Sequence, residues 1–523
     1  MPEPARLRST LATALVAALA LSACSGAGDA GPEPRPVETS TSTSASASSS
    51  SGTPATEDVP AGLEDYYGQT LDWQDCRKGD QCATLEVPLD YAQPQGRTIE
   101  LSLLRVPAGD QDSKVGSLLV NPGGPGASGV DYAAAATTYF NKPIRTYFDI
   151  VGFDPRGVGR SDPIDCLSDE QLDEFAASDP DPDDVPEQQL SDALLRQFGE
   201  GCLARSGALT RHVSTEEAAR DMDVLRSALR QPKMLYFGAS YGTFLGGTYA
   251  DLFPDKVGRM VLDGAVDPTV SLVKGAEVQA KGFETALRAY VGHCVDKGDC
   301  YLGDSVDEGI GRIQDLLEQT DAEPLPAAEG RPLTEGLAVL GIWAPLYNRD
   351  FWYALDVGLK SAFAGNGKVL LQLADAYLNR GKDGYKDNSG EAIYAVNCLD
   401  RDEWVDPGEV ARVQGPIIKA SPTFGRLFAW GLTACGSWAV HSGKKPHPLR
   451  ATGSAPIMVV GTTRDPATPL SWAEGLVRQL DDAVLVKRDG DGHTGYKAGN
   501  KCVDEAVEAY LVSGTVPPDT VSC

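Results

Sequence analysis

The chain has 523 residues and a formal net charge of −28, with 46 Lys and Arg against 74 Asp and Glu. Hydrophobic residues make up 42% and charged residues 23%, which is typical of folded domains and excludes a wholly disordered chain. The acidic balance argues against a nucleic-acid partner, because phosphate binding relies on clustered Lys and Arg. At roughly 150 residues per domain, the length is sufficient for two or three lobes.

The N-terminus has the pattern of a signal peptide over residues 1–23. Arg6 and Arg8 precede an apolar run at 11–21, and small residues follow. The sequence Leu-Ser-Ala-Cys that ends at Cys24 resembles a bacterial lipobox, in which the cysteine is acylated and becomes the mature N-terminus. An ordinary secretory signal that happens to contain Cys24 is the alternative. We therefore expect an exported protein, either anchored outside the cell membrane through Cys24 or secreted into the cell envelope or beyond.

The sequence contains eleven cysteines. Without Cys24 ten remain, an even number that suits the disulfides of an exported chain. The others are close neighbours in sequence, and we predict that these neighbours form disulfides. Free buried thiols are the alternative. The predicted pairs are Cys76–Cys82, Cys166–Cys202, Cys294–Cys300, Cys398–Cys435 and Cys502–Cys523. No Cys-x-x-Cys spacing or Cys/His cluster indicates zinc, so no metal is expected.

Residues 24–60 are rich in Ser, Thr, Ala, Pro and Gly. Such a segment buries too little apolar surface to offset its chain entropy, so we predict a disordered stalk. No later apolar stretch approaches the roughly 18 residues of a membrane-spanning helix.

From residue 83 onward, apolar runs alternate with helical patterns, which predicts an α/β fold with a mostly parallel sheet. Helices are expected at 214–230, where Ser214 to Glu217 form a capping-box sequence, and at 501–511. The acidic, proline-interrupted segment 179–187 is predicted to be a solvated loop rather than a metal site. The predicted strands are 98–106, 116–121, 147–153, 233–237, 258–262, 456–460 and 484–488.

Roughly 190 residues separate the strand at 258–262 from the strand at 456–460. Their pattern is rich in helices, and the segment is long enough to form a lobe of its own. We predict a large, mainly helical cap inserted into the α/β domain and covering the carboxyl edge of the sheet. The predicted segments are 61–265 for the first part of the core, 266–450 for the cap and 451–523 for the last part of the core.

A Gly-x-Ser-x-Gly motif, Gly238 to Gly242, directly follows a predicted strand and precedes a helical pattern. In that position the motif predicts a nucleophile elbow, with Ser240 held clear of the backbone. The N–H of Tyr241, at the start of the helix, would stabilise a negative carbonyl oxygen.

A serine nucleophile needs a histidine base and a carboxylate that orients it, and in α/β-hydrolases they follow the serine in the order acid, histidine. His493 lies in a Gly-rich loop after the last predicted strand, and Asp465 lies in the loop after the strand at 456–460. Asp491 is closer to His493 in sequence, but a turn-forming role suits it better. The other histidines precede the serine or lie in the predicted cap and its connections; they are His212, His293, His441 and His447.

The second oxyanion donor is expected in the loop Asn121 to Gly129, which follows the strand at 116–121. Gly124 is our choice, because glycine lets the backbone approach a ligand closely. Gly123 and Gly126 are alternatives, and a purely structural turn is a further one.

Five motifs follow one another along the chain: Gly123-Gly124-Pro125-Gly126, Asp154-Pro155-Arg156-Gly157-Val158-Gly159-Arg160-Ser161, Gly238 to Gly242, Asp465-Pro466 and Gly492-His493. Together they resemble the tripeptidyl aminopeptidase and proline iminopeptidase branch of the α/β-hydrolases, over the chain from about residue 71 to its end. The resemblance implies Ser240 as nucleophile, Asp465 as acid, His493 as base, and Gly124 with Tyr241 as oxyanion donors. One departure is Asn121-Pro122, which stands where many iminopeptidases have a histidine.

The resemblance further implies removal of short peptides, tripeptides first, from substrates with free N-termini through an acyl-enzyme. An anionic side chain in the cap would then bind the substrate ammonium, and Glu391 and Asp400 are the candidates. A lipid or ester hydrolase with the same triad, and a binding protein on an inactive hydrolase scaffold, are the alternatives. No cofactor motif is present, and a monomer is expected.

Overall fold

The computed structural model describes residues 59–328, 330–518 and 520–523, which belong to one compact unit beginning at Val59. The predicted signal peptide, Cys24 and the stalk up to residue 58 lie outside the described residues. Within them, no helix has the length and apolar character that crossing a membrane requires.

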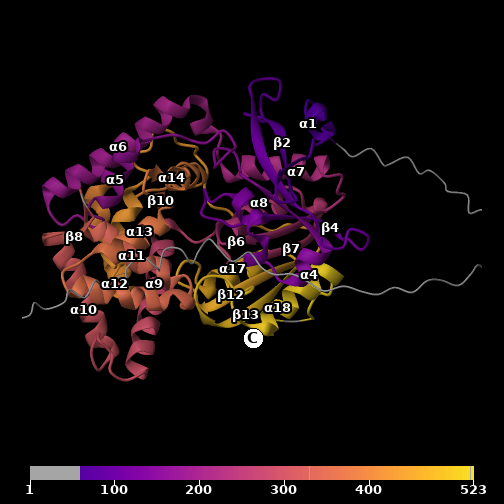
Figure 1. Cartoon of the computed structure of the whole chain (residues 1–523). Coiled ribbons are helices and arrows are strands. Elements are labelled where there is room, and N and C mark those ends of the chain that lie inside the picture. The colour runs from indigo at the N-terminus through magenta and orange to yellow at the C-terminus, as the bar shows by residue number, and fades with distance from the viewer. Residues whose placement is uncertain (1–58, 329, 519) are drawn as a thin grey trace, which may run out of the picture. The chain divides into compact units, whose positions relative to one another are not determined.

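The core of the unit is a ten-stranded sheet in the order β1-β2-β3-β5-β4-β6-β7-β12-β13-β14 (Figure 1). Neighbouring strands are antiparallel from β1 to β5 and parallel from β5 onward. The strands are β1 Gln74–Arg77, β2 Asp80–Pro88, β3 Thr98–Val106, β4 Gly116–Asn121, β5 Phe148–Phe153, β6 Met234–Ala239, β7 Val257–Asp263, β12 Ile457–Arg464, β13 Ala483–Asp491 and β14 Val521–Ser522.

Helices α1–α8 precede or follow the strands of the first part of the sheet, and α17 and α18 follow its last long strands. Their bounds are α1 Glu64–Gly68, α2 Gly129–Ala134, α3 Ala136–Tyr139, α4 Lys142–Tyr147, α5 Asp169–Ala177, α6 Val185–Ser206, α7 Thr215–Ala228, α8 Tyr241–Leu252, α17 Leu470–Gln479 and α18 Lys501–Glu508.

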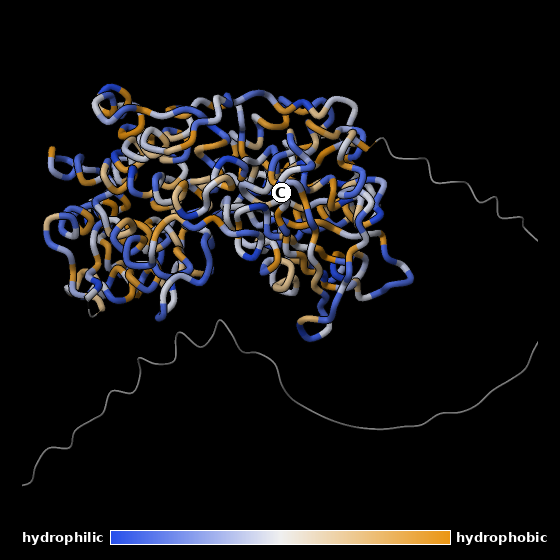
Figure 2. The backbone as a smooth tube through the Cα atoms, turned by 90° about the horizontal axis from the view of Figure 1, so that it is seen from above, coloured by the Kyte–Doolittle hydropathy of each residue, from blue (hydrophilic) through white to orange (hydrophobic). Residues whose placement is uncertain are grey.

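Successive side chains of a strand point to opposite faces of the sheet, and in the buried strands both sets are apolar. Helices therefore cover both faces. Leu119 and Tyr236 belong to an apolar core with helices α7, α8 and α17. Their neighbours Leu118 and Phe237 belong to a second core with α2, α4 and α18. In Figure 2 hydrophobic and hydrophilic stretches alternate along the tube throughout the unit.

A helical cap is inserted between β7 and β12. It has an apolar core of its own, built mainly from α9 to α13, while α14 packs against the sheet domain. Its elements are α9 Leu272–Asp296, α10 Val306–Ala322, α11 Glu335–Leu346, α12 Trp352–Phe363, α13 Lys368–Tyr377, α14 Ser389–Asp400, α15 Val410–Ala420 and α16 Gly425–Trp430, with the hairpins β8 Leu325–Ala328/β9 Arg331–Leu333 and β10 Arg380–Gly381/β11 Gly384–Tyr385.

Helices α5 and α6, which the sequence places in the first part of the core, lie with the cap helices (Figure 1). Ion pairs join this segment to the insertion: Arg380 Nε lies 2.6 Å from Asp173 Oδ1 in α5, and Arg426 Nε lies 2.9 Å from Asp181 Oδ2 in the loop between α5 and α6. The helical layer therefore contains helices from both sides of residue 265, and the boundary between core and cap at that residue stays a prediction.

The seven predicted strands are all present, and β3 and β4 have the predicted bounds. The strands β6, β12 and β13 extend further toward their carboxyl ends than predicted. The predicted loop at 179–187 ends earlier than predicted. Helix α6 begins at Val185, after a capping box in which the Asp184 side chain accepts a hydrogen bond from the N–H of Glu187. At α7 only half of the expected capping box forms: Ser214 accepts from the N–H of Glu217, whose own carboxylate contacts His212 and the Ser214 hydroxyl.

Candidate active site

Ser240 occupies a sharp turn between β6 and α8. Its φ of 57° and ψ of −126° are strained for a residue with a side chain, as is typical of a nucleophile elbow. The flanking glycines are required by space: a Cβ on Gly238 would lie 2.3 Å from the carbonyl oxygen of Gly242, and one on Gly242 would lie 2.8 Å from the oxygen of Asn121. The turn therefore depends on the sequence pattern that predicts it.

The loop after β4 lies directly against this elbow. Gly123, with a φ of 99°, is the contacting residue, since a Cβ there would lie 2.8 Å from Ser240 Cβ and 2.9 Å from Tyr241 N. Its own N–H donates to Asn121 Oδ1 at 2.9 Å. Asn121, the departure from the family pattern, thus holds the loop in place.

The predicted oxyanion donors are the backbone N–H groups of Gly124 and Tyr241. Gly124 follows the contacting glycine with a φ of 105°, and Tyr241 is the first residue of α8. Neither N–H has a hydrogen-bond acceptor among the described residues. Because the N–H of Gly123 is already used by Asn121, Gly124 remains the donor we favour in this loop.

Asp465 and His493 meet where the loops after β12 and β13 converge. The imidazole Nδ1 lies 2.9 Å from each carboxylate oxygen of Asp465. The carboxylate is fully buried and also accepts from the backbone N–H groups of Ala467, Thr468 and Thr494 at 2.8–3.1 Å. This many donors fix the carboxylate in one orientation, and the carboxylate in turn fixes the imidazole.

The other imidazole nitrogen, His493 Nε2, is buried and has no hydrogen-bond partner among the described residues. The imidazole lies over the end of β7, where a Cβ on Gly264 would be 3.2 Å from His493 Cε1. The neighbouring Asp263 carbonyl accepts from Ser240 N. Serine and histidine thus approach the same strand end, although no direct hydrogen bond joins them within the part of the chain described here.

The cap closes over the histidine. Tyr347 follows α11, and its carbonyl oxygen accepts a hydrogen bond from the backbone N–H of His493 at 2.8 Å. The rings of Tyr347 and His493 meet edge to face with centroids 5.3 Å apart. Only 11% of the His493 side chain is exposed, so the base is shielded from bulk water.

Burial alone would lower the pKa of His493, because it disfavours the charged imidazolium. The charge and hydrogen bond of Asp465, with the charge of Asp263, outweigh this effect and raise the pKa above its usual value. Asp263 is a carboxylate that the sequence reasoning missed. Its position directly after a predicted buried strand was the available signal.

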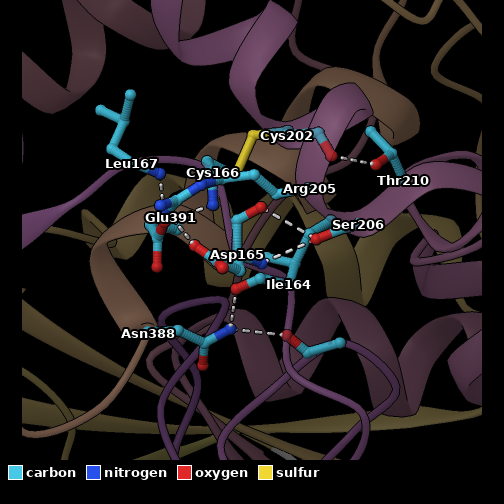
Figure 3. The surroundings of a disulfide bond; sticks show 11 residues. Ile164, Asp165, Cys166, Leu167, Cys202, Arg205, Ser206, Thr210, Asn388 and Glu391 are labelled. Atoms are coloured by element: carbon cyan, nitrogen blue, oxygen red, sulfur yellow. Dashed lines mark hydrogen bonds and ion pairs between the residues drawn. A yellow bond between two sulfur atoms is a disulfide. The ribbon is translucent and has the colours of Figure 1, made fainter.

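The two carboxylates predicted to bind an ammonium group contact the polypeptide backbone. Glu391 Oε1 accepts from Cys166 N at 2.6 Å and Leu167 N at 3.0 Å, beside the Cys166–Cys202 disulfide (Figure 3). Asp400 accepts from the backbone N–H and the hydroxyl of Thr215, which also contacts the hydroxyl of Tyr241. Burial raises the pKa of Asp400 to about 6, although these bonds from Thr215 lower it.

Five disulfides are present in the part of the chain that the structure describes, and they join the same cysteines as the predicted pairs. Cys166–Cys202 fastens the segment before α5 to α6, and Cys398–Cys435 joins α14 to the segment after α16. The elements around the site are therefore held by covalent links as well as by packing.

Comparison with known proteins adds family information to this geometry. A sequence model described as the alpha/beta hydrolase fold matches residues 116–306, and one described as TAP-like protein matches residues 421–523. The chain is 37% identical over 482 residues to the serine protease Hip1 of Mycobacterium tuberculosis, covering 87% of this chain and 91% of that protein.

Two further relatives carry different names. Carboxylesterase B of Mycobacterium tuberculosis is 37% identical over 468 residues, covering 86% of this chain and 89% of its own length. The tripeptidyl aminopeptidase of Streptomyces lividans is 31% identical over 467 residues, covering 87% of this chain and 86% of that protein. All three alignments include most of both the sheet domain and the cap.

Proposed function

The chain belongs to the tripeptidyl aminopeptidase-like family of α/β-hydrolases, and we propose that it is an exported serine peptidase that releases short peptides, tripeptides first, from free N-termini. The observation that carries this proposal is the buried Asp465–His493 pair: the imidazole lies at the strand end whose backbone also binds Ser240, and its Nε2 has no hydrogen-bond partner among the described residues.

In the proposed mechanism, His493 Nε2 accepts the proton of the Ser240 hydroxyl while Oγ attacks the scissile carbonyl carbon. The resulting oxyanion accepts hydrogen bonds from the N–H groups of Gly124 and Tyr241. The imidazolium then donates its proton to the leaving amine, and the C–N bond breaks to give an acyl-enzyme. Water repeats the sequence and releases the peptide, while Asp465 stays ionised and holds the imidazole tautomer.

The free N-terminus of the substrate requires an anionic partner. Of the two candidates, Asp400 uses both carboxylate oxygens on Thr215, whereas Glu391 Oε2 makes no hydrogen bond among the described residues. The first turn of α14 also lies on the oxyanion loop, since a Cβ on Gly126 would be 3.0 Å from Ala392 Cβ. We therefore favour Glu391 over Asp400 as the ammonium ligand.

Ester hydrolysis by the same triad is the second candidate function. The relative named carboxylesterase B favours it. Both reactions proceed through an acyl-enzyme on serine, so the triad alone does not distinguish them. The two activities are distinguished by the leaving group of the substrate and by its need for a free amine.

Export and lipid attachment rest on the sequence of residues 1–24 alone. We propose that residues 1–23 direct export and that Cys24 carries the anchor. Peptide substrates outside the cytoplasm are consistent with this location, as are five disulfides, which persist in oxidising compartments.

The test compares two chromogenic tripeptide amides that differ only in acetylation of the N-terminus, together with a short-chain chromogenic ester. Wild type should cleave the free-amine substrate, and Ser240→Ala should lower kcat by about 10⁶-fold with its thermal unfolding unchanged. Glu391→Gln should raise KM for the free amine and leave ester cleavage intact. Equal cleavage of the acetylated substrate would contradict the aminopeptidase, and cleavage of the ester alone would establish the esterase.

A further inference from the structure

A second buried carboxylate lies at the active site, and no step of the mechanism above uses it. Asp263 is the last residue of β7, and only 1% of it is exposed. In the sheet it pairs with Ala239 on one side and with Val460 on the other. It therefore stands between the strand that carries Ser240 and the strand that leads to Asp465.

Asp263 contacts both halves of the catalytic machinery. Its carbonyl oxygen accepts the N–H of Ser240 at 2.8 Å. Its carboxylate accepts the N–H groups of the second and third residues after His493: Oδ1 binds Gly495 N at 2.7 Å, and Oδ2 binds Tyr496 N at 2.8 Å. One residue thus links the elbow to the loop of the base.

We propose that Asp263 is a positioning residue that joins the nucleophile elbow to the histidine loop and fixes the approach of His493 to Ser240. This inference rests on the proposed function of the triad.

The contacts of the two carboxylates are complementary. Asp465 holds the imidazole itself and the N–H of Thr494. Asp263 holds the next two backbone N–H groups and does not hydrogen-bond the imidazole. The loop is consequently held at successive residues by two carboxylates from adjacent strands. Since no hydrogen bond joins Ser240 to His493 directly within the described residues, their relative position depends on such backbone contacts.

A turn-forming role alone would not require a buried charge. Burial of a carboxylate is costly unless hydrogen bonds or charges compensate it. Burial raises the pKa of Asp263 to about 6, while the N–H groups of Tyr496 and Gly495 and the charge of His493 lower it. Within the described residues no salt bridge to Asp263 forms, and the facing groups are His493, Asp465, the Arg488 guanidinium and the Tyr132 hydroxyl.

Asp263 also acts on the histidine through its charge, which stabilises the imidazolium. Replacing it with a neutral residue removes this stabilisation and lowers the pKa of His493. Because the protonated histidine cannot act as a base, the acid limb of the pH profile of kcat/KM should move to lower pH. A residue with a merely structural role would not move this limb.

The first experiment compares Asp263→Asn with Asp149→Asn. Asp149 is also buried and hydrogen-bonded, and it pairs with Lys114. It lies at the opposite, amino end of β5 and serves as a control for loss of a buried carboxylate away from the site. In Asp263→Asn the side-chain NH₂ group, a donor, faces one of the two loop N–H groups, so one hydrogen bond to the loop is lost. We expect roughly 10- to 100-fold lower kcat/KM, mainly through kcat, with the acid limb at lower pH. Asp149→Asn should keep the wild-type limb.

Two readouts keep the test independent of substrate choice and of folding. The rate of labelling by a fluorophosphonate reports on the triad whether peptides or esters are the substrates. The chain has five histidines, so ¹³C-labelled imidazoles allow the titration of His493 to be followed directly. An unchanged His493 titration with wild-type labelling in folded Asp263→Asn would overturn the proposal.

Asp263→Glu separates charge from position and serves if the asparagine variant does not fold. It keeps the negative charge but displaces the carboxylate by one methylene group. We expect a lower labelling rate with the acid limb close to that of wild type, and a wild-type rate would contradict the positioning role. If Ser240→Ala retained activity or labelling, the proposed triad would fail instead, which distinguishes the two outcomes.

Discussion

At the residue scale, the site is built from backbone shapes that few side chains tolerate. Ser240 has a strained positive φ, and the glycine of the opposing loop lies in contact with it. Such strain persists only where surrounding contacts enforce it, here the hydrogen bond from Ser240 N to Asp263 and the Asn121 bond to Gly123. Small changes at these contacts should therefore affect catalysis more than stability.

Gly123→Ala tests this expectation. The added Cβ would lie 2.6 Å from the oxygen of Ala239 and 2.8 Å from Ser240 Cβ, so the loop must move away from the elbow. We expect a loss of at least about 100-fold in kcat, the scale of removing an oxyanion donor. The matched control is Gly79→Ala, because Gly79 has a φ of 96° and open space around it.

Both variants place alanine at a similar positive φ, so backbone strain should cost each about 1–3 kcal/mol of stability, and the close contacts of the new Cβ should add to the loss in Gly123→Ala. Only Gly123→Ala should lose activity. Thermal unfolding and kcat/KM measured on the same samples check this, and equal activity in the two variants would show that the loop does not form the oxyanion hole.

At the element scale, the cap is attached to the sheet domain by carboxylates as well as by apolar packing. The final residue of α14, Asp400, binds the first turn of α7, and Glu391 in its first turn binds the segment before α5. The resemblance to aminopeptidases implied an ammonium ligand in the cap and made these two side chains the candidates. Their backbone partners are far away in sequence and could not be identified without the tertiary structure.

A group of acidic residues where the cap helix α11 meets the loop between α5 and α6 gives the stability of the cap a pH dependence. The carboxylates of Asp179, Asp181 and Glu335 lie within 4.8 Å of one another. Burial, together with the charge and hydrogen bond of Asp181, raises the pKa of Glu335 to about 9 from an ordinary value of 4.5. The folded cap binds this proton more tightly than the unfolded chain, so its contribution to stability is complete below about pH 4.5 and is lost as the pH rises towards 9.

Glu335→Gln should remove that loss, because the amide is neutral at every pH and can donate a hydrogen bond to Asp181. We expect a higher Tm than wild type at pH 9 and a similar Tm at pH 5, measured by scanning calorimetry. Glu64→Gln is the control, since Glu64 is also the first residue of a helix but is exposed. A Tm difference for Glu335→Gln that is the same at both pH values would contradict the proposed protonation.

At the scale of the whole molecule, the order of the chemistry-bearing motifs along the chain was sufficient to predict the fold and to select Ser240, Asp465 and His493. Each follows a buried strand, and parallel neighbouring strands end at one edge of the sheet. Asp263 follows a strand in the same way, yet an aspartate before glycine also forms ordinary turns. Its contact with the histidine loop depends on the strand order, which only the three-dimensional structure supplies.

The attachment of the whole molecule to a membrane depends, in our proposal, on Cys24 alone. The chain has a formal net charge of −28, which opposes adsorption to anionic lipid, and among the described helices none could span a bilayer. Wild type expressed in a bacterium that processes lipoproteins should stay with membranes in about 1 M salt, where electrostatic adsorption is screened, and leave them in detergent. Cys24→Ser should appear in the soluble fraction, whereas Ser25→Ala, which keeps the cysteine, should behave as wild type. Recovery of the wild-type chain in the soluble fraction with an unmodified Cys24, established by intact mass, would instead identify a secreted enzyme, and the catalytic predictions would be unaffected.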